Sequence, residues 1–145
     1  DEWEAPTLAG WLETLEREIM MATRPVVLVG HSLGVQTIVA ASQTQADTKV
    51  KGAFLVAPPD VDEHPDVPEA TSPFRGLSSD PLRFPSMLVA SSNDPYCSVE
   101  RAAEFAARWG SDFHVAGDVG HINIESGHGP WPEGLLMFTR LMSRI

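Results

Sequence analysis

Three residues of this chain have the types and the chain order needed for nucleophilic catalysis: Ser32, Asp94 and His121. A serine hydroxyl attacks a carbonyl carbon readily only when a base takes its proton, and histidine, with an ordinary pKa of about 6.5, can do so at neutral pH. An aspartate can hold the imidazole in the required tautomer and stabilise the imidazolium that forms. The set therefore predicts attack on a carbonyl carbon, with a covalent intermediate on Ser32.

Ser32 lies in the pattern Gly-His-Ser-Leu-Gly at positions 30–34, directly after an apolar run at 26–29. A strand that runs into a Gly-x-Ser-x-Gly turn lifts the serine oxygen clear of the backbone, and the N–H of the next residue, Leu33, is predicted to be one oxyanion-hole donor. We expect a side chain at Gly30 or Gly34 to crowd the strand or helix that closes against the turn. The alternative is a glycine-rich turn in which Ser32 only caps the following helix.

The elements that must position these residues follow from the spacing of apolar side chains. Helices are predicted over residues 7–22, 35–43, 99–109 and 135–142, and strands over 25–30, 50–57, 86–91 and 113–116. Alternating strands and helices favour a parallel sheet with helices on both faces, and such sheets bind ligands at the carboxyl ends of their strands. Since Ser32, Asp94 and His121 each follow a predicted strand, we expect them to meet at one edge of the sheet.

Composition excludes several classes of function. The 145 residues, 43% of them hydrophobic, suit one domain with a packed core. A net charge of −10 argues against nucleic acid and anionic membranes as partners, and no apolar run is long enough to span a bilayer. The single cysteine, Cys97, excludes an internal disulfide and points to a reducing, cytoplasmic compartment. Its thiol is either redox-sensitive or, in the simpler interpretation, buried filler.

Weaker signals concern the rest of the site. His121, Glu125 and His128 could form a metal cluster, but they lack the helical spacing of a zinc site, so neither a metal nor another cofactor is predicted. His31, beside the nucleophile, and Trp131 are candidate substrate contacts, although Trp131 is equally suited to the core. The proline-rich stretch at 58–85 is either a wall over a pocket or a plain connection.

Three segments carry a family resemblance: GHSLG at 30–34, SSNDPYC at 91–97 and GHINIESGHGPWPEG at 120–134. Together they resemble the small serine hydrolases similar to retinoblastoma-binding protein nine and the bacterial YdeN-type proteins, and DEWEAP at 1–6 resembles a segment of the same family. The resemblance implies an α/β-hydrolase fold, a three-layer sandwich with a mostly parallel sheet, and Ser32, Asp94 and His121 as its triad. It does not imply binding to the retinoblastoma protein, because the Leu-x-Cys-x-Glu docking motif is absent.

The resemblance also implies a strand before position 1, with the loop that supplies the second oxyanion-hole donor. Residues 26–29 are apolar at every position, as in a central strand, and without a neighbour they would form an exposed apolar edge. We therefore expect this single domain to lack its first strand here. Two functions follow: a serine hydrolase of small carboxylic esters or amides, and a non-catalytic protein-binding module on a hydrolase scaffold.

Overall fold

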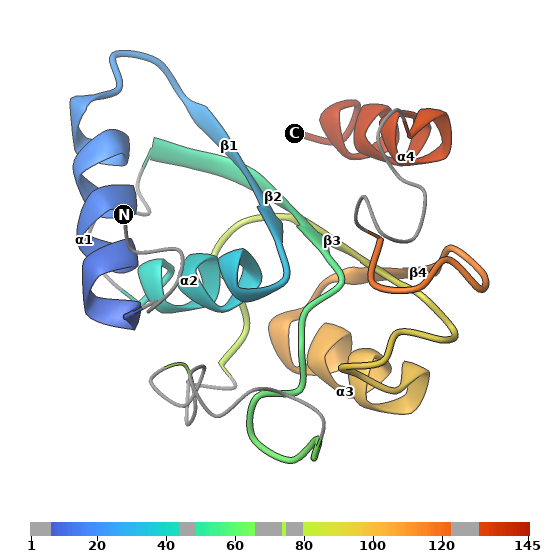
Figure 1. Cartoon of the computed structure of the whole chain (residues 1–145). Helices are drawn as coiled ribbons and strands as arrows, with labels where there is room; N and C mark the ends of the chain where they lie inside the picture. The colour runs from blue at the N-terminus through green and yellow to red at the C-terminus, as the bar shows by residue number, and fades with distance from the viewer. Residues whose placement is uncertain (1–6, 44–48, 66–73, 75–79, 123–130) are drawn as a thin grey trace.

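The computed structural model describes residues 7–43, 49–65, 74, 80–122 and 131–145 (Figure 1). Its elements are, in chain order, α1 (Leu8–Met21), β1 (Val26–His31), α2 (Leu33–Ala41), β2 (Val50–Val56), β3 (Ser86–Ala90), α3 (Val99–Trp109), β4 (Asp112–Val115) and α4 (Pro132–Met142). Each predicted helix and strand is present, with bounds that differ by at most three residues.

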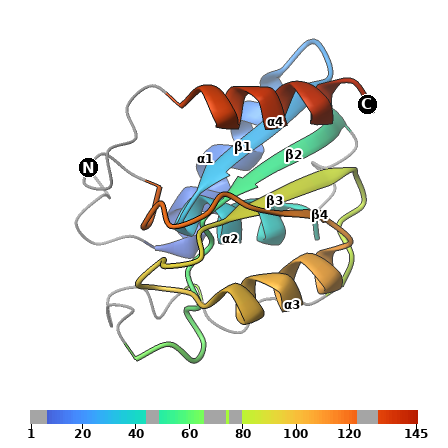
Figure 2. The same ribbon diagram turned by 90° about the vertical axis from the view of Figure 1, so that its right-hand side faces the viewer.

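The four strands form one sheet in the order β1-β2-β3-β4, and each neighbouring pair is parallel. In the register, His31 lies opposite Val56, and Val56 lies opposite Val89. The carboxyl ends of the four strands therefore lie together along one edge of the sheet, as predicted, and this carboxyl edge is distinct from the two lateral edges formed by β1 and β4. Because β1 and β4 lie at opposite sides of the sheet, a residue after β4 must reach across it to meet one after β1 (Figure 2).

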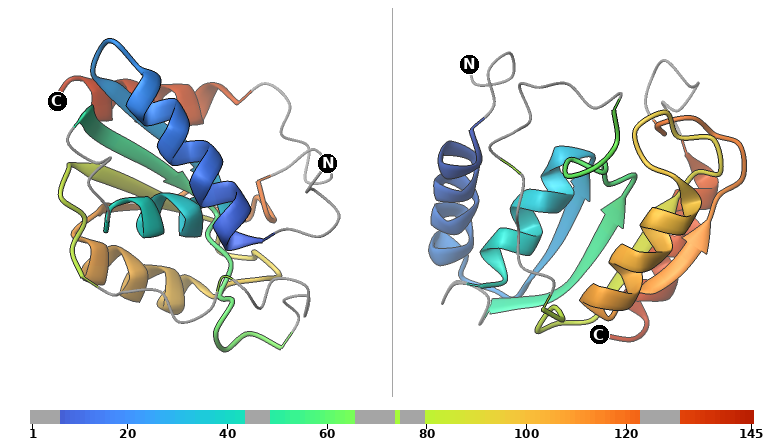
Figure 3. Two further views of the ribbon diagram at one scale, coloured as in Figure 1. Left: turned by 90° about the vertical axis from the view of Figure 1, so that its left-hand side faces the viewer. Right: turned by 90° about the horizontal axis from the view of Figure 1, so that it is seen from below.

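Helices cover both faces of the sheet, which confirms the predicted three-layer arrangement. Side chains alternate along β2, so that Ala53 and Leu55 join a core beneath α1, α2 and α3, while Phe54 and Val56 join a core beneath α4. Figure 3 shows α1, α2 and α3 on the same side of the sheet, and Figure 2 shows α4 on the other side.

The helix ends show why the chain turns where it does. α1 begins where the Thr7 side chain accepts a hydrogen bond from the Gly10 N–H, and α3 begins in the same way at Ser98. α3 ends at Gly110, whose φ of 70° is in the left-handed region that glycine tolerates. α1, with 14 residues, is the longest of these helices, and none in the described ranges is long and apolar enough to cross a bilayer.

β1 is an edge strand within the part of the chain that the structure describes. Val29, Phe54 and Met87 form one row across neighbouring strands, and their exposed fractions are 62%, 4% and 2%. Burial on this face therefore ends abruptly at β1. The expected further strand beside β1 stays a prediction.

Candidate active site

Ser32 is the single residue between β1 and α2. Its backbone is held at φ 59° and ψ −125°, a conformation that residues other than glycine rarely adopt. The Ser32 N–H donates to the Val56 carbonyl at 2.9 Å, and the Ser32 carbonyl accepts from the Val35 N–H at 2.9 Å. The hydroxyl makes no capping bond to α2, so the capping alternative is wrong. The strained turn instead presents this hydroxyl at the carboxyl edge of the sheet.

The two glycines of the turn have different surroundings. A Cβ on Gly30 would lie 2.7 Å from Ile38 Cδ1 and 2.9 Å from the carbonyl carbon of Gly34, which confirms the predicted crowding. A Cβ on Gly34 would meet no described atom within 4 Å. The prediction that a side chain there would crowd a neighbour is therefore wrong, because Gly34 faces a groove and not a packed element.

Backbone strain gathers at this edge of the sheet. In the described ranges, Ser32, Ala57 and Ile122 are the non-glycine residues with positive φ, at 59°, 51° and 53°. Ser32 follows β1, Ala57 follows β2, and Ile122 adjoins His121. Strained residues of this kind persist where surrounding contacts hold them, and they cluster at functional sites.

The structure brings the three predicted residues into one hydrogen-bonded chain. His121 Nε2 lies 2.9 Å from Ser32 Oγ, and His121 Nδ1 lies 3.0 and 2.9 Å from the two carboxylate oxygens of Asp94. An ionised carboxylate only accepts hydrogen bonds, so Nδ1 carries the proton and Nε2 is left to accept from the serine hydroxyl. The side chains of Asp94 and His121 are only 2% and 10% exposed. This arrangement can move a proton from Ser32 to His121.

The groups beside Asp94 hold the imidazole in place. The Tyr96 N–H donates to Asp94 Oδ1 at 2.9 Å, so the carboxylate has a second fixed donor. The Tyr96 ring packs edge-on against the His121 ring, with their centroids 4.8 Å apart. With Asp94 at one ring nitrogen and Tyr96 against the ring, His121 has little freedom to rotate.

Two polar residues that the sequence analysis passed over anchor the loop that carries His121. Asn93 Oδ1 accepts from the Gly120 N–H at 2.8 Å and from the Ser91 hydroxyl at 2.9 Å. Ser91 Oγ in turn accepts from the Val119 N–H at 3.1 Å. The sequence feature that could have identified these two residues is the polar run directly after β3. Side-chain oxygens there can reach the loop that follows the neighbouring strand β4.

A buried ion pair that the sequence analysis did not identify supports the loop that carries Asp94. Asp60 Oδ1 lies 3.3 Å from Arg101 Nε, and the Asp60 N–H donates to the Tyr96 carbonyl at 2.9 Å. The stretch after β2 is thereby joined to the start of α3.

Burial raises the pKa of the Cys97 thiol to about 12, so the thiol stays protonated at neutral pH. Burial and the raised pKa therefore favour the interpretation of Cys97 as buried filler over that of a redox-sensitive group.

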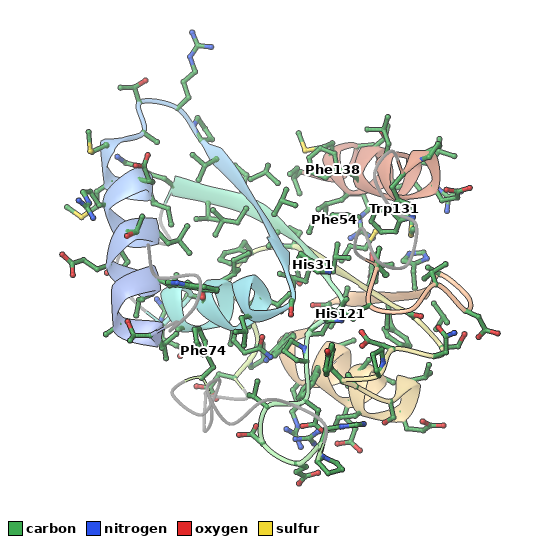
Figure 4. The ribbon with its side chains drawn as sticks, in the orientation of Figure 1. His31, Phe54, Phe74, His121, Trp131 and Phe138 are labelled. Atoms are coloured by element: carbon green, nitrogen blue, oxygen red, sulfur yellow. The ribbon has the colours of Figure 1, made fainter. Side chains whose placement is uncertain are left out.

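His31 and Trp131, the two candidate substrate contacts, lie in different surroundings (Figure 4). His31 lines a groove next to Ser32, and its Nε2 lies 2.8 Å from the backbone carbonyl oxygen of His121. Trp131 packs beside Phe54 in the core beneath α4, and a Cβ on Gly134 would overlap its ring. Trp131 does not line this groove, and its placement favours the core interpretation.

The groove has a volume of about 640 Å³ and lies between β1, α1 and α2. Apolar side chains and glycines make up most of its lining, together with His31 on β1 and Glu18 on α1, and Ser32 itself is not part of the lining. No described residue of the 58–85 stretch lines it. The described Phe74 is instead fully buried against Trp11 and Leu33, which favours a packed connection over a pocket wall for this part.

Leu33 is the first residue of α2, so its N–H has no acceptor within the helix. That N–H lies directly after Ser32, where an oxyanion-hole donor is expected. The second donor is expected from beside β1, and no described strand or loop pairs with that edge. Both donors stay predictions.

The alternative metal cluster would need His121, Glu125 and His128 to lie together. Glu125 and His128 lie outside the described residues, and no group of three candidate ligands occurs within them.

Comparison with known proteins shows the family of this chain. A family model described as serine hydrolase matches residues 1–140. This chain belongs to the serine hydrolase family. The crystal structure of a YdeN-like hydrolase from Pectobacterium atrosepticum has 34% sequence identity to this serine hydrolase and a TM-score of 0.79, covering 92% of this chain and 68% of that one.

More distant structures agree on the fold of this serine hydrolase. The ydeN gene product of B. subtilis has a TM-score of 0.77 at 18% identity, covering 96% of this chain and 77% of that one. The Bacillus cereus carboxylesterase has a TM-score of 0.58 at 18% identity, covering 95% and 58%. A search of curated proteins gave no match. The expected family and the α/β-hydrolase fold are thus confirmed.

Proposed function

We propose that this serine hydrolase cleaves small carboxylic esters through an acyl-enzyme formed on Ser32. The observation that carries the proposal is the chain from Ser32 Oγ to His121 Nε2 and from His121 Nδ1 to Asp94, with separations of 2.9 to 3.0 Å. Ordered contacts of this length are what a nucleophile, its base and the group that orients the base require.

In the proposed reaction, Ser32 Oγ attacks the ester carbonyl carbon while His121 Nε2 takes the hydroxyl proton. The Leu33 N–H donates to the oxyanion of the tetrahedral intermediate. His121 then gives the proton to the departing alkoxide as the carbon–oxygen bond breaks, which leaves an acyl group on Ser32. Water attacks that ester by the same steps, the acid departs, and Ser32 regains its proton. Asp94 stays ionised throughout and stabilises the imidazolium.

Two features support a small ester, with amides as a harder substrate of the same site. The groove lined by His31 and Gly34, which flank Ser32 and Leu33 in the chain, is mainly apolar, and this suits the acyl or alcohol part of an uncharged ester. One structural neighbour is named a carboxylesterase and another a monoacylglycerol lipase, and both names describe esterases. An ester is also easier to cleave than an amide, since an alkoxide leaves more readily than an amine.

A fluorophosphonate probe, which reacts only with activated serines, tests the proposal. We expect the wild-type chain to be labelled and Ser32→Ala to lose labelling completely, together with hydrolysis of p-nitrophenyl acetate. Ser143→Ala is the matched control, since Ser143 caps the far end of α4 and is exposed. Labelling that persists in folded Ser32→Ala would show that the reactive serine lies elsewhere.

The second candidate is a non-catalytic binding module, and one observation favours it. No described strand pairs with the free edge of β1, where the second oxyanion-hole donor is expected, and loss of one such donor costs on the order of 10²–10³ in kcat. A folded wild-type chain that shows neither labelling nor an initial burst of p-nitrophenol would support this second function.

A further inference from the structure

His31 joins two segments that are 90 residues apart in the sequence. It is the last residue of β1, next to Ser32, and its Nε2 lies 2.8 Å from the backbone carbonyl oxygen of His121. A carbonyl oxygen can only accept a hydrogen bond, so His31 Nε2 carries a proton and donates it. The two imidazole rings lie 4.9 Å apart between centroids, tilted by 51° (Figure 4).

The hydrogen bond from His31 constrains the separation between Ser32 and His121, which strand pairing alone does not fix. β1 and β4 lie at opposite sides of the sheet, so the separation of Ser32 and His121 depends on the loop after β4. Asn93 and Ser91 tie that loop to the end of β3, two strands away from Ser32. Among the described residues, the bond from His31 ties the main chain of His121 directly to the turn that holds the nucleophile.

We propose that His31 is a positioning residue, whose Nε2–H holds the backbone of His121 at the distance that lets its ring accept the Ser32 proton. The proposal rests on the function proposed above and assigns His31 a role besides the substrate contact predicted for it. An error of about 1 Å in such a separation can lower a rate about 10²-fold.

The protonation state of His31 is compatible with this role. Partial burial of the ring lowers the pKa of His31, and this outweighs the upward effects of the His121 carbonyl and the Asp94 charge. The ring is therefore neutral at neutral pH, with its proton on Nε2. A neutral neighbour also avoids placing a second positive charge 4.9 Å from the His121 imidazolium during the reaction.

Two nearly isosteric variants test the donor. In His31→Gln the side-chain amide places an N–H close to the position of Nε2, whereas His31→Met has similar length and no donor. With p-nitrophenyl acetate, we expect kcat of the Met variant to be at least about tenfold below that of the Gln variant, with similar KM. Circular dichroism and thermal unfolding establish that each variant is folded, and His31→Phe replaces the Met variant if that one is not.

Two results would overturn the proposal. Equal kcat in the folded Gln and Met variants would show that the donor does not matter, and a difference confined to KM would make His31 a substrate contact only. The nitrogen resonances of the His121 ring give a test without turnover, and we expect them to move in the Met variant more than in the Gln variant. Inactivity of the wild-type chain would defeat the proposed function and leave this NMR comparison intact.

Discussion

On the side of Ser32 that faces β2, β3 and β4, the Asp94 carboxylate accepts a hydrogen bond from the His121 ring, and His31 Nε2 donates to the His121 carbonyl. Asn93 Oδ1 accepts from the N–H of the preceding residue, Gly120. On the side of β1, α1 and α2, by contrast, a groove of about 640 Å³ is open. The first side holds the groups of the proposed proton transfer, and there Asp94 and His121 are buried. The second side is where the oxyanion-hole donors are predicted, and there Val29 is 62% exposed and a Cβ on Gly34 would have free space around it. Among the described residues, the hydrogen bonds that would activate Ser32 are thus more complete than the contacts that would bind the oxyanion and the substrate.

The largest effect is expected from a change at Asp94, on the side of Ser32 that faces β2, β3 and β4. Asp94→Asn keeps the size of the side chain but removes the charge and favours the wrong tautomer of His121, so kcat should fall by about 10⁴. Ester hydrolysis under substrate saturation measures it. The matched control is Asp118→Asn, because Asp118 lies at the same edge and contacts the exposed Ser92 hydroxyl and not His121. A decrease of less than tenfold in Asp94→Asn would show that Asp94 does not orient the base.

A pair of alanine substitutions compares the two glycines of the turn through their effects on stability. Gly30→Ala forces a Cβ against Ile38 and the Gly34 backbone, and should lower the free energy of unfolding by about 1–3 kcal/mol. Gly34→Ala enters open space within α2, and should leave stability unchanged or raise it by up to about 1 kcal/mol. Urea unfolding of both variants measures the difference. Equal destabilisation would mean that Gly34 is packed after all.

The smallest effect is expected at the edge strand. Val29→Thr places a hydroxyl on an exposed surface, so the free energy of unfolding should change by less than about 0.5 kcal/mol. Val89→Thr is the matched control, because Val89 is 0% exposed and an unpaired hydroxyl there should cost about 1–3 kcal/mol. If thermal unfolding shows equal losses for the two variants, some further segment or partner covers the face of β1.

Much of the fold and of the candidate site could be predicted from local patterns. Apolar spacing placed each helix and strand to within three residues, because burial of one face imposes its period on the sequence. Ser32, Asp94 and His121 were found because each follows a strand, and parallel strands bring such positions to one edge. The Gly34 prediction failed because a pattern of glycines does not reveal which of them meets a neighbour.

The sequence by itself determined the order of the elements, the parallel class of the sheet and the three residues of the candidate triad, since these follow from periodicity and turn chemistry. Only the tertiary structure decided that His31 donates to His121, that Asn93 holds its loop and that Trp131 belongs to the core. The substrate and the cytoplasmic location stay predictions. The physical reason for the division is distance along the chain: local preferences act over a few residues, whereas these contacts join strands and loops that meet only after folding.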